Sequence, residues 1–354
     1  MAERNRARIN RGAVAAGGRA SSALAKLCRM EPPGCPLLRQ EFFARLLPDF
    51  DTAWDEARIA DPDDAARASL RGLRNGMERA AERCLFPGRG LHRHVRFYAL
   101  PLLVETDDCV PESQVDYALA WAAEATRGFM SPVPGANATC APAFFRYQDL
   151  MAVPLSTVQV ALANAACDGN PAAALRRIPF RVRPAAARCS PIHLRFAVCV
   201  ALSDGDADEV LQENSRWGAL EDAVRVMLGF RLRVPVKVTT TFRTSFYRAA
   251  HDGLRTYQAA RLGRVVAAFG ERDGISATLD LRDAETQRRA RLTLTRGCTV
   301  LAACMLQVPL DEGPSEMLAR MGEWLRDEGI ANIASPSPGG ACDAACAPIL
   351  AVPV

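Results

Sequence analysis

The sequence predicts an α+β fold, with a mainly helical N-terminal part and a largely antiparallel sheet with helices on one face in the C-terminal part. Two observations lead to this prediction. Apolar residues recur at helical intervals in the first half, whereas the second half mixes helix-length segments with strand-length segments. Two of the strand-length segments are joined by the short turn AETQ, which indicates a hairpin and therefore antiparallel pairing.

Helical periodicity, Pro/Gly turns and one alternating segment divide the first half of the chain. We expect, in chain order, helices over 24–47 and 63–84, a turn over 87–90, a strand over 94–105, a helix over 112–128, a long loop over 131–142 and a helix over 155–167. Gly128 is the expected C-cap of the helix that precedes the loop. The loop has the sequence SPVPGANATCAP and is the best candidate for a linker or a lid.

The second half shows clearer boundaries. We expect, in chain order, a strand over 192–202, a helix over 206–228, a strand over 229–248, a helix over 246–268, hairpin strands over 274–283 and 288–297, a strand over 299–308 and a helix over 314–329. Pro314 marks the start of the last helix, and Gly329 marks its end. The chain therefore divides into a mainly helical region over 1–130, a loop or linker with a helix over 131–191, an α+β domain over 192–330 and an irregular tail over 331–354.

Composition sets limits on the partner and the compartment. The chain of 354 residues is 49% apolar and 24% charged, which is the ordinary globular balance. The formal net charge is only +4, so an anionic partner has to be bound by a local group of charges. We expect no membrane-spanning segment and no signal peptide, and therefore a cytoplasmic protein. The 12 cysteines are dispersed among apolar positions, and we expect them to be free, buried thiols.

Strand parity identifies a candidate binding surface. In 230–243 the even positions are mostly apolar and the odd positions are mostly basic residues or threonine, and the same division recurs in 289–295 and 192–200. If these strands share a sheet, their polar faces coincide and form a platform for phosphates or other anions. The expected anion-binding residues are Arg231, Arg233, Lys237, Arg243, Arg289 and Arg291, with Tyr247 at the edge for stacking. The alternative interpretation is an ordinary solvent-facing sheet without a ligand.

Catalytic and metal-binding motifs are weak in this sequence. His92 and His94 have a spacing that metal sites use, but no third ligand lies nearby, and His193 and His251 are isolated. Common nucleotide-binding and hydrolase motifs do not occur. We therefore expect no metal site and no cofactor, and the sequence favours a protein that is not an enzyme.

Three segments carry a resemblance to known sequences. FYRAAHDGLR (246–255), LRDEGI (325–330) and CDAACAPIL (342–350) resemble corresponding pieces of an uncharacterised betaproteobacterial family of unknown function. The resemblance covers the last third of the chain, and it implies a bacterial cytosolic protein without supplying an activity. Cys342 and Cys346 are separated by three residues rather than two, so the resemblance assigns them no metal.

The leading functional hypothesis is a non-enzymatic cytosolic binding or assembly protein that contacts an anionic partner, such as nucleic acid, through the arginine-rich face. One alternative is an enzyme that acts on a phosphorylated or carboxylated small molecule under the loop 131–142. Another is a structural or interaction subunit that binds a protein partner or a second copy of itself. A contiguous exposed apolar patch is the observation that distinguishes this last alternative.

Overall fold

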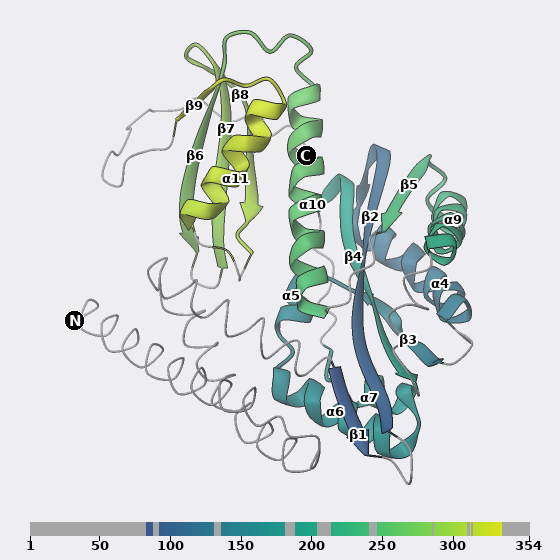
Figure 1. Ribbon diagram of the computed structural model, residues 1–354. Helices are drawn as coiled ribbons and strands as arrows, with labels where there is room; N and C mark the ends of the chain where they lie inside the picture. Colours follow the sequence, from purple (N-terminus) through teal and green to yellow (C-terminus); the bar gives the residue numbers. More distant parts are fainter. Residues whose placement is uncertain are drawn as a thin grey trace, which may run out of the picture.

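A computed structural model describes residues 83–87, 92–130, 136–180, 188–203, 214–240, 246–284, 287–309, 312 and 314–334. Within these residues two sheets, one of five strands and one of four, lie on either side of the long helix α10 (Phe246–Ala267) (Figure 1). The α+β fold class is confirmed. No helix within the described ranges combines the length and the apolar character that a membrane span requires.

The larger sheet is antiparallel throughout. Its strands are β1 (Arg83–Pro87), β2 (His92–Pro111), β3 (Ala136–Phe145), β4 (Cys189–Ser203) and β5 (Val236–Thr240). Their order is β1-β2-β4-β3, and β5 also pairs with β2. Because β2 is 20 residues long, β1 pairs near its start and β5 pairs with 102–106. The pairing of β2 with β4 joins a strand from the region predicted to be mainly helical to a strand from the predicted α+β domain.

Helices cover both faces of this sheet. The helices are α4 (Glu112–Met130), α5 (Tyr147–Met151), α6 (Leu155–Asp168), α7 (Pro171–Arg177) and α9 (Asn214–Leu232). On β2, Phe97 and Ala99 belong to a core with residues of α5, α6, α7 and the first half of α10, whereas Leu100 and Leu102 belong to a second core with residues of α4 and α9. The central strands are therefore apolar on both faces, which removes the alternation expected of a half-exposed strand.

The smaller sheet has helices on one face, as predicted. Its strands are β6 (Ile275–Ala284), β7 (Gln287–Arg296), β8 (Thr299–Gln307) and β9 (Asn332–Ala334). Their order is β8-β7-β6-β9, and β9 is parallel to β6. α11 (Pro314–Asp327) and the second half of α10 cover the face that carries Leu292 and Leu294 of β7. The hairpin of β6 and β7 is confirmed.

α10 contributes to the cores of both sheets. Phe246 and Leu254 pack in one core, and Leu262 and Val266 pack in the core of the smaller sheet. Gly253 sets the distance of the helix from the larger sheet, since a Cβ atom there would lie 2.7 Å from Cβ of Pro101 and 2.9 Å from Cε1 of Phe196. Real side chains do not approach so closely, so a residue without a Cβ is required at this crossing.

Most of the predicted elements are confirmed, but the strand over 229–248 is wrong. α9 continues to Leu232, only 236–240 form a strand, and α10 begins at Phe246. The helical spacing of Leu220, Val224 and Leu228, all buried, dominates over the alternation that follows them. Arg233, whose φ is 57°, then ends the helix in the left-handed region, where its amide bonds to the carbonyl of Gly229.

The predicted lid is also wrong. β3 covers 136–145 and pairs with β4, so most of the segment 131–142 belongs to a sheet. Its small residues fit closely beneath α4, where Ala138 and Cys140 are buried. Helix α4 also extends to Met130, two residues beyond the expected C-cap Gly128.

Several predictions concern residues beyond the described ranges. These are the helix over 24–47, nearly all of the helix over 63–84, most of the turn over 87–90, the first residues of the loop over 131–142 and of the helix over 206–228, Arg243 and the tail from 335 onward, including Cys342 and Cys346. The described end of the segment 63–84 belongs to β1.

The prediction of free thiols is confirmed for some cysteines and wrong for others. Cys189, Cys298 and Cys304 are free as expected, but of these three only Cys304 is buried as expected, because Cys189 and Cys298 are exposed. A disulfide joins Cys140 to Cys199, so the prediction is wrong for that pair. The two residues are brought together by the pairing of β3 with β4, which their separate places in the sequence do not reveal.

Candidate docking surface

The predicted anion-binding residues do not share one sheet. Arg231 lies in the last turn of α9 and Arg233 follows it, Lys237 is on β5, Arg289 and Arg291 are on β7 of the other sheet, and Tyr247 is in α10. The platform fails because it required 229–248 to be a strand. The parity of two strands is confirmed. On β7, Leu292 is buried while Arg291 is partly exposed on the other face, and on β5, Val238 is buried while Lys237 is exposed. Anion binding by Arg289 and Arg291 stays a prediction.

Lys237 and Tyr247 make hydrogen bonds within the protein. Lys237 Nζ donates to Glu105 Oε1 at 3.0 Å. Tyr247 is buried, and its hydroxyl donates to the carbonyl oxygen of Val153 at 3.0 Å. Because the start of α10 packs into the core, the ring of Tyr247 cannot stack on a nucleobase at a sheet edge.

The polar positions of β4 are buried under α4. Arg195 is 4% exposed, and its Nε donates to Asp116 Oδ1 at 2.6 Å. Arg146, which follows β3, donates through Nη2 to the other oxygen of Asp116 at 2.7 Å and lies 3.4 Å from Glu112 Oε2. These ion pairs hold α4 against the sheet. Because the acidic side chains of α4 engage both arginines, the cluster does not offer them to an anionic ligand. Sequence reasoning placed Arg195 on a solvent-facing strand; the signal it missed is the i,i+4 acid pair Glu112 and Asp116.

His193 lies on the same face of β4 as Arg195. Burial and then the positive charge of Arg195 lower the pKa of His193 from 6.5 to about 4. The imidazole is therefore neutral at physiological pH, and its Nε2 atom is buried without a hydrogen-bond partner. This environment is that of a core histidine rather than a general base.

A second buried polar cluster links α10 to α11. Glu312 is buried, and its two carboxylate oxygens accept hydrogen bonds from Nε and Nη2 of Arg320, each at 2.6 Å. Nη2 of Arg320 also donates to Gln258 Oε1 at 3.1 Å. The geometry is that of a bidentate structural ion pair. Across the described residues, no group of histidine, cysteine or acidic side chains is arranged to hold a metal ion.

Two helices that cover the larger sheet carry large exposed apolar side chains. Tyr117 and Trp121 are one turn apart on α4, and Val226 and Phe230 are one turn apart on α9. Phe230 is 79% exposed, Val226 61% and Trp121 48%. We refer to these four residues together with Arg231 as the α4/α9 patch. The two helices cover the same face of the sheet (Figure 1).

Arg231 connects the two helices of the patch. Its guanidinium carbon lies 4.0 Å from the centroid of the Trp121 ring, within the range of a cation–π contact. A pocket of about 200 Å³ opens beside it, with the lining residues Ser113, Gln114, Tyr117, Ala118, Arg231 and Leu232. Pockets for drug-sized ligands usually have volumes of about 300–1,000 Å³. The pocket therefore fits a single side chain of a partner better than a metabolite.

Sequence reasoning missed this patch because it assigned Phe230 to the buried side of a strand. In the helix α9, Phe230 lies away from the buried stripe of Leu220, Val224 and Leu228. Comparison of the chain with protein-family models, curated proteins and solved structures found no match.

Proposed function

We propose that the protein is a cytoplasmic binding or assembly protein without catalysis of its own, and that it docks a protein partner on the α4/α9 patch. The observation that carries the proposal is the exposure of Phe230 and Trp121 on helices that cover one face of the sheet, with the guanidinium group of Arg231 over the Trp121 ring. Aromatic residues and arginine are the residue types that contribute most to binding energy in protein interfaces. Large exposed apolar side chains on two neighbouring helices support an interaction subunit over an idle surface.

The expected partner presents an apolar side chain next to a carboxylate. The apolar group would enter the pocket beside Tyr117, and the carboxylate would bind Arg231. Stacking on Trp121 holds the guanidinium group in one orientation while the N–H groups at its edge stay available for a bidentate contact. Arg233, which follows α9, adds positive charge to the same end of the helix. The proposed partner is therefore still anionic, as in the leading hypothesis, but it binds the α4/α9 patch instead of a sheet face.

Two observations weigh against the enzyme alternative. The described part of the segment expected to form a lid, 136–142, belongs to strand β3, and the pocket beside Arg231 is small. The proposed location rests on Cys189 and Cys298, which are free and exposed. Exposed free thiols persist best in a reducing compartment.

The proposal is tested with matched surface variants of the full chain. Val226 and Val160 are 61% and 60% exposed, but only Val226 belongs to the patch, so Val226→Asp and Val160→Asp place the same charge in and outside it. Proteins cross-linked to the wild type in cells are identified by mass spectrometry, and the partner is then purified and titrated by calorimetry. We expect Val226→Asp and Phe230→Asp to weaken binding about tenfold or more, and Val160→Asp to leave it unchanged.

The same titration tests the charged contact. Arg231→Gln should weaken binding and reduce its dependence on ionic strength, because exposed ionic contacts are screened by salt. Equal binding by the wild type and Phe230→Asp would overturn the proposal. Failure of the wild type to capture any stable partner, together with a monomer in light scattering, would overturn it as well.

A further inference from the structure

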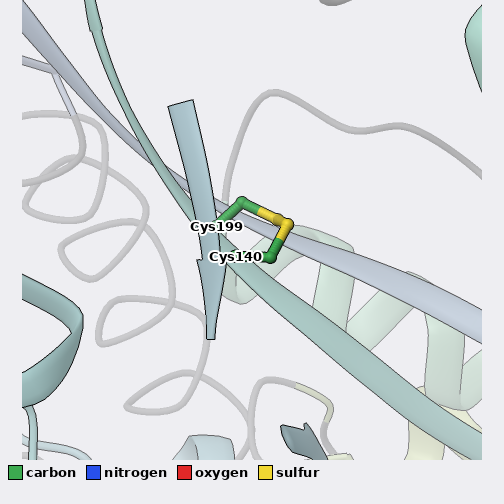
Figure 2. The surroundings of a disulfide bond; sticks show 2 residues. All are labelled: Cys140 and Cys199. Carbon is green, nitrogen blue, oxygen red and sulfur yellow. A yellow bond between two sulfur atoms is a disulfide. The ribbon is translucent and has the colours of Figure 1, made fainter. Parts of the chain in front are cut away.

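The disulfide between Cys140 and Cys199 lies inside the larger sheet (Figure 2). The two residues are directly opposite in the register of β3 and β4, and their Cα atoms are 4.1 Å apart. Both side chains are buried. The bond closes a loop between positions 59 residues apart in the sequence, so it links two strands that come together only in the folded chain.

The bond lies under the helix that carries half of the patch. Cys140 and Cys199 pack in one core with Val115, Leu119 and Ala122 of α4. β3 is an edge strand of the sheet, and its pairing with β4 stops after Cys140 and resumes at Phe144. The disulfide therefore links β3 covalently to β4, just before the point where their pairing is interrupted.

Other described cysteines indicate the redox environment. Cys189 and Cys298 are exposed and free, and Cys304 is buried and free. In an oxidising compartment, exposed thiols are prone to pair, whereas disulfides found in reducing compartments are usually transient and take part in catalysis or redox sensing. A disulfide in a chain that also carries exposed free thiols fits a transient disulfide in a reducing compartment.

We propose that Cys140 and Cys199 form a redox modification site, which interconverts between dithiol and disulfide by exchange with a small-molecule disulfide. This proposal is independent of the docking function. In oxidation, the thiolate of one cysteine attacks the small disulfide, forms a mixed disulfide and releases one small thiolate. The thiolate of the second cysteine then attacks the mixed disulfide and releases the other. Two electrons pass to the small molecule, and the protons of both cysteines end on the released thiols.

Burial makes this exchange depend on an opening of the structure. Neither sulfur is accessible while α4 is packed on the sheet, so exchange occurs only in molecules in which α4 or the edge strand β3 has locally separated. Reduction leaves two small, weakly polar thiols in an apolar core, where free cysteines are well accommodated. The fold should therefore survive reduction, while α4 and β3 open more often.

The first experiment follows the bond in the full-length protein. Samples equilibrate in glutathione buffers with different ratios of thiol to disulfide, are quenched in acid and alkylated, and Cys140 and Cys199 are read by mass spectrometry. We expect both states to be populated within the range of the buffers. A bond that stays closed at every ratio would show a purely structural disulfide, and alkylation of both cysteines in oxidising buffer would show that no bond forms; either result overturns the proposal.

The second experiment tests the role of α4. Leu119→Ala removes a buried contact between α4 and the sheet, and we expect it to speed reduction roughly tenfold or more, since local opening becomes easier. Leu292→Ala makes an equivalent truncation in the other sheet and should change the reduction rate much less. Equal acceleration by the two variants would mean that exchange follows global unfolding, which overturns the gating by α4.

Hydrogen exchange provides the structural measurement. Reduction should accelerate amide exchange in 112–130 and 136–145 and leave β6, β7 and β8 unchanged. The double variant Cys140→Ala/Cys199→Ala should behave like the reduced wild type and stop responding to glutathione. Cys189→Ser/Cys298→Ser is the control for the exposed thiols and should keep the full response. Loss of the response in this control would assign it to other cysteines and overturn the proposal.

Discussion

Asp116 on α4 accepts a hydrogen bond of 2.6 Å from Nε of Arg195, a β4 residue that is almost completely buried. An arginine in this position requires a counter-charge, because an unpaired charge in the core is strongly destabilising. The carboxylate of Asp116 is itself partly exposed, at 31%, so water can replace some of the lost interaction. The pair is therefore a local support for the helix of the α4/α9 patch.

Replacing Asp116 by Ala should lower the free energy of unfolding by about 2–3 kcal/mol, somewhat less than for a fully buried pair. Urea denaturation measures the change. Asp116→Ala/Arg195→Met removes both charges and keeps most of the arginine volume, and it should recover much of the loss. If Asp116→Ala unfolds at the same urea concentration as the wild type, the pair does not support α4.

His193 should make stability depend on pH in a defined window. Its pKa is about 4 in the folded chain and 6.5 when unfolded. Between these values the unfolded state binds a proton that the folded state does not, so the free energy of unfolding falls as the pH is lowered, by about 3 kcal/mol in total. Urea titrations at about pH 7 and about pH 4.5 of the wild type and His193→Gln isolate this contribution. Parallel pH profiles would contradict the assignment.

Two glycines of α10 should respond in opposite directions to the same substitution. Gly253→Ala places a methyl group against Pro101 and Phe196, and we expect it to destabilise by about 1–3 kcal/mol through overpacking. Gly263→Ala meets only the flexible end of Glu328, so the better helix propensity of alanine should dominate, with an effect between zero and about 1 kcal/mol of stabilisation. Thermal unfolding of both variants checks the prediction. Equal effects would mean that α10 does not approach the sheet as closely as described.

The two separated arginine pairs should act independently on a polyanion. We expect Arg231→Ser/Arg233→Ser and Arg289→Ser/Arg291→Ser each to lower the salt concentration that elutes the protein from heparin, and the fourfold variant to show the sum. Distant sites contribute additively, and each lost ionic contact reduces the salt dependence. Complete loss of retention in one double variant would instead identify a single anion site.

Much of the fold is predictable from local patterns. Helix α10 and the hairpin of β6 and β7 follow from periodicity and turn residues, because the spacing of their apolar residues matches the faces that they bury. The end of α9 is not predictable in this way. Alternation over 230–238 and helical spacing from Leu220 onward compete there, and packing on the sheet decides between them.

The candidate site depends on features that lie far apart in the sequence. Arg195 is buried because helices cover both faces of the sheet. The sequence of strand β4 by itself does not show this coverage. The pairing of Cys140 with Cys199 follows from the register of β3 and β4. Contact between Arg231 and Trp121 follows from the placement of two helices that are distant in the chain. The candidate site therefore depends on tertiary contacts, which the sequence does not show directly.

α10 belongs to two cores at once, and this has a consequence for how the molecule unfolds. Unfolding of this shared helix would expose apolar surface on both sheets, so the loss of one half should trigger the loss of the second. The described sheets are then expected to melt in one calorimetric transition rather than two. A proteolytic cut within this single helix would therefore expose the cores of both sheets together.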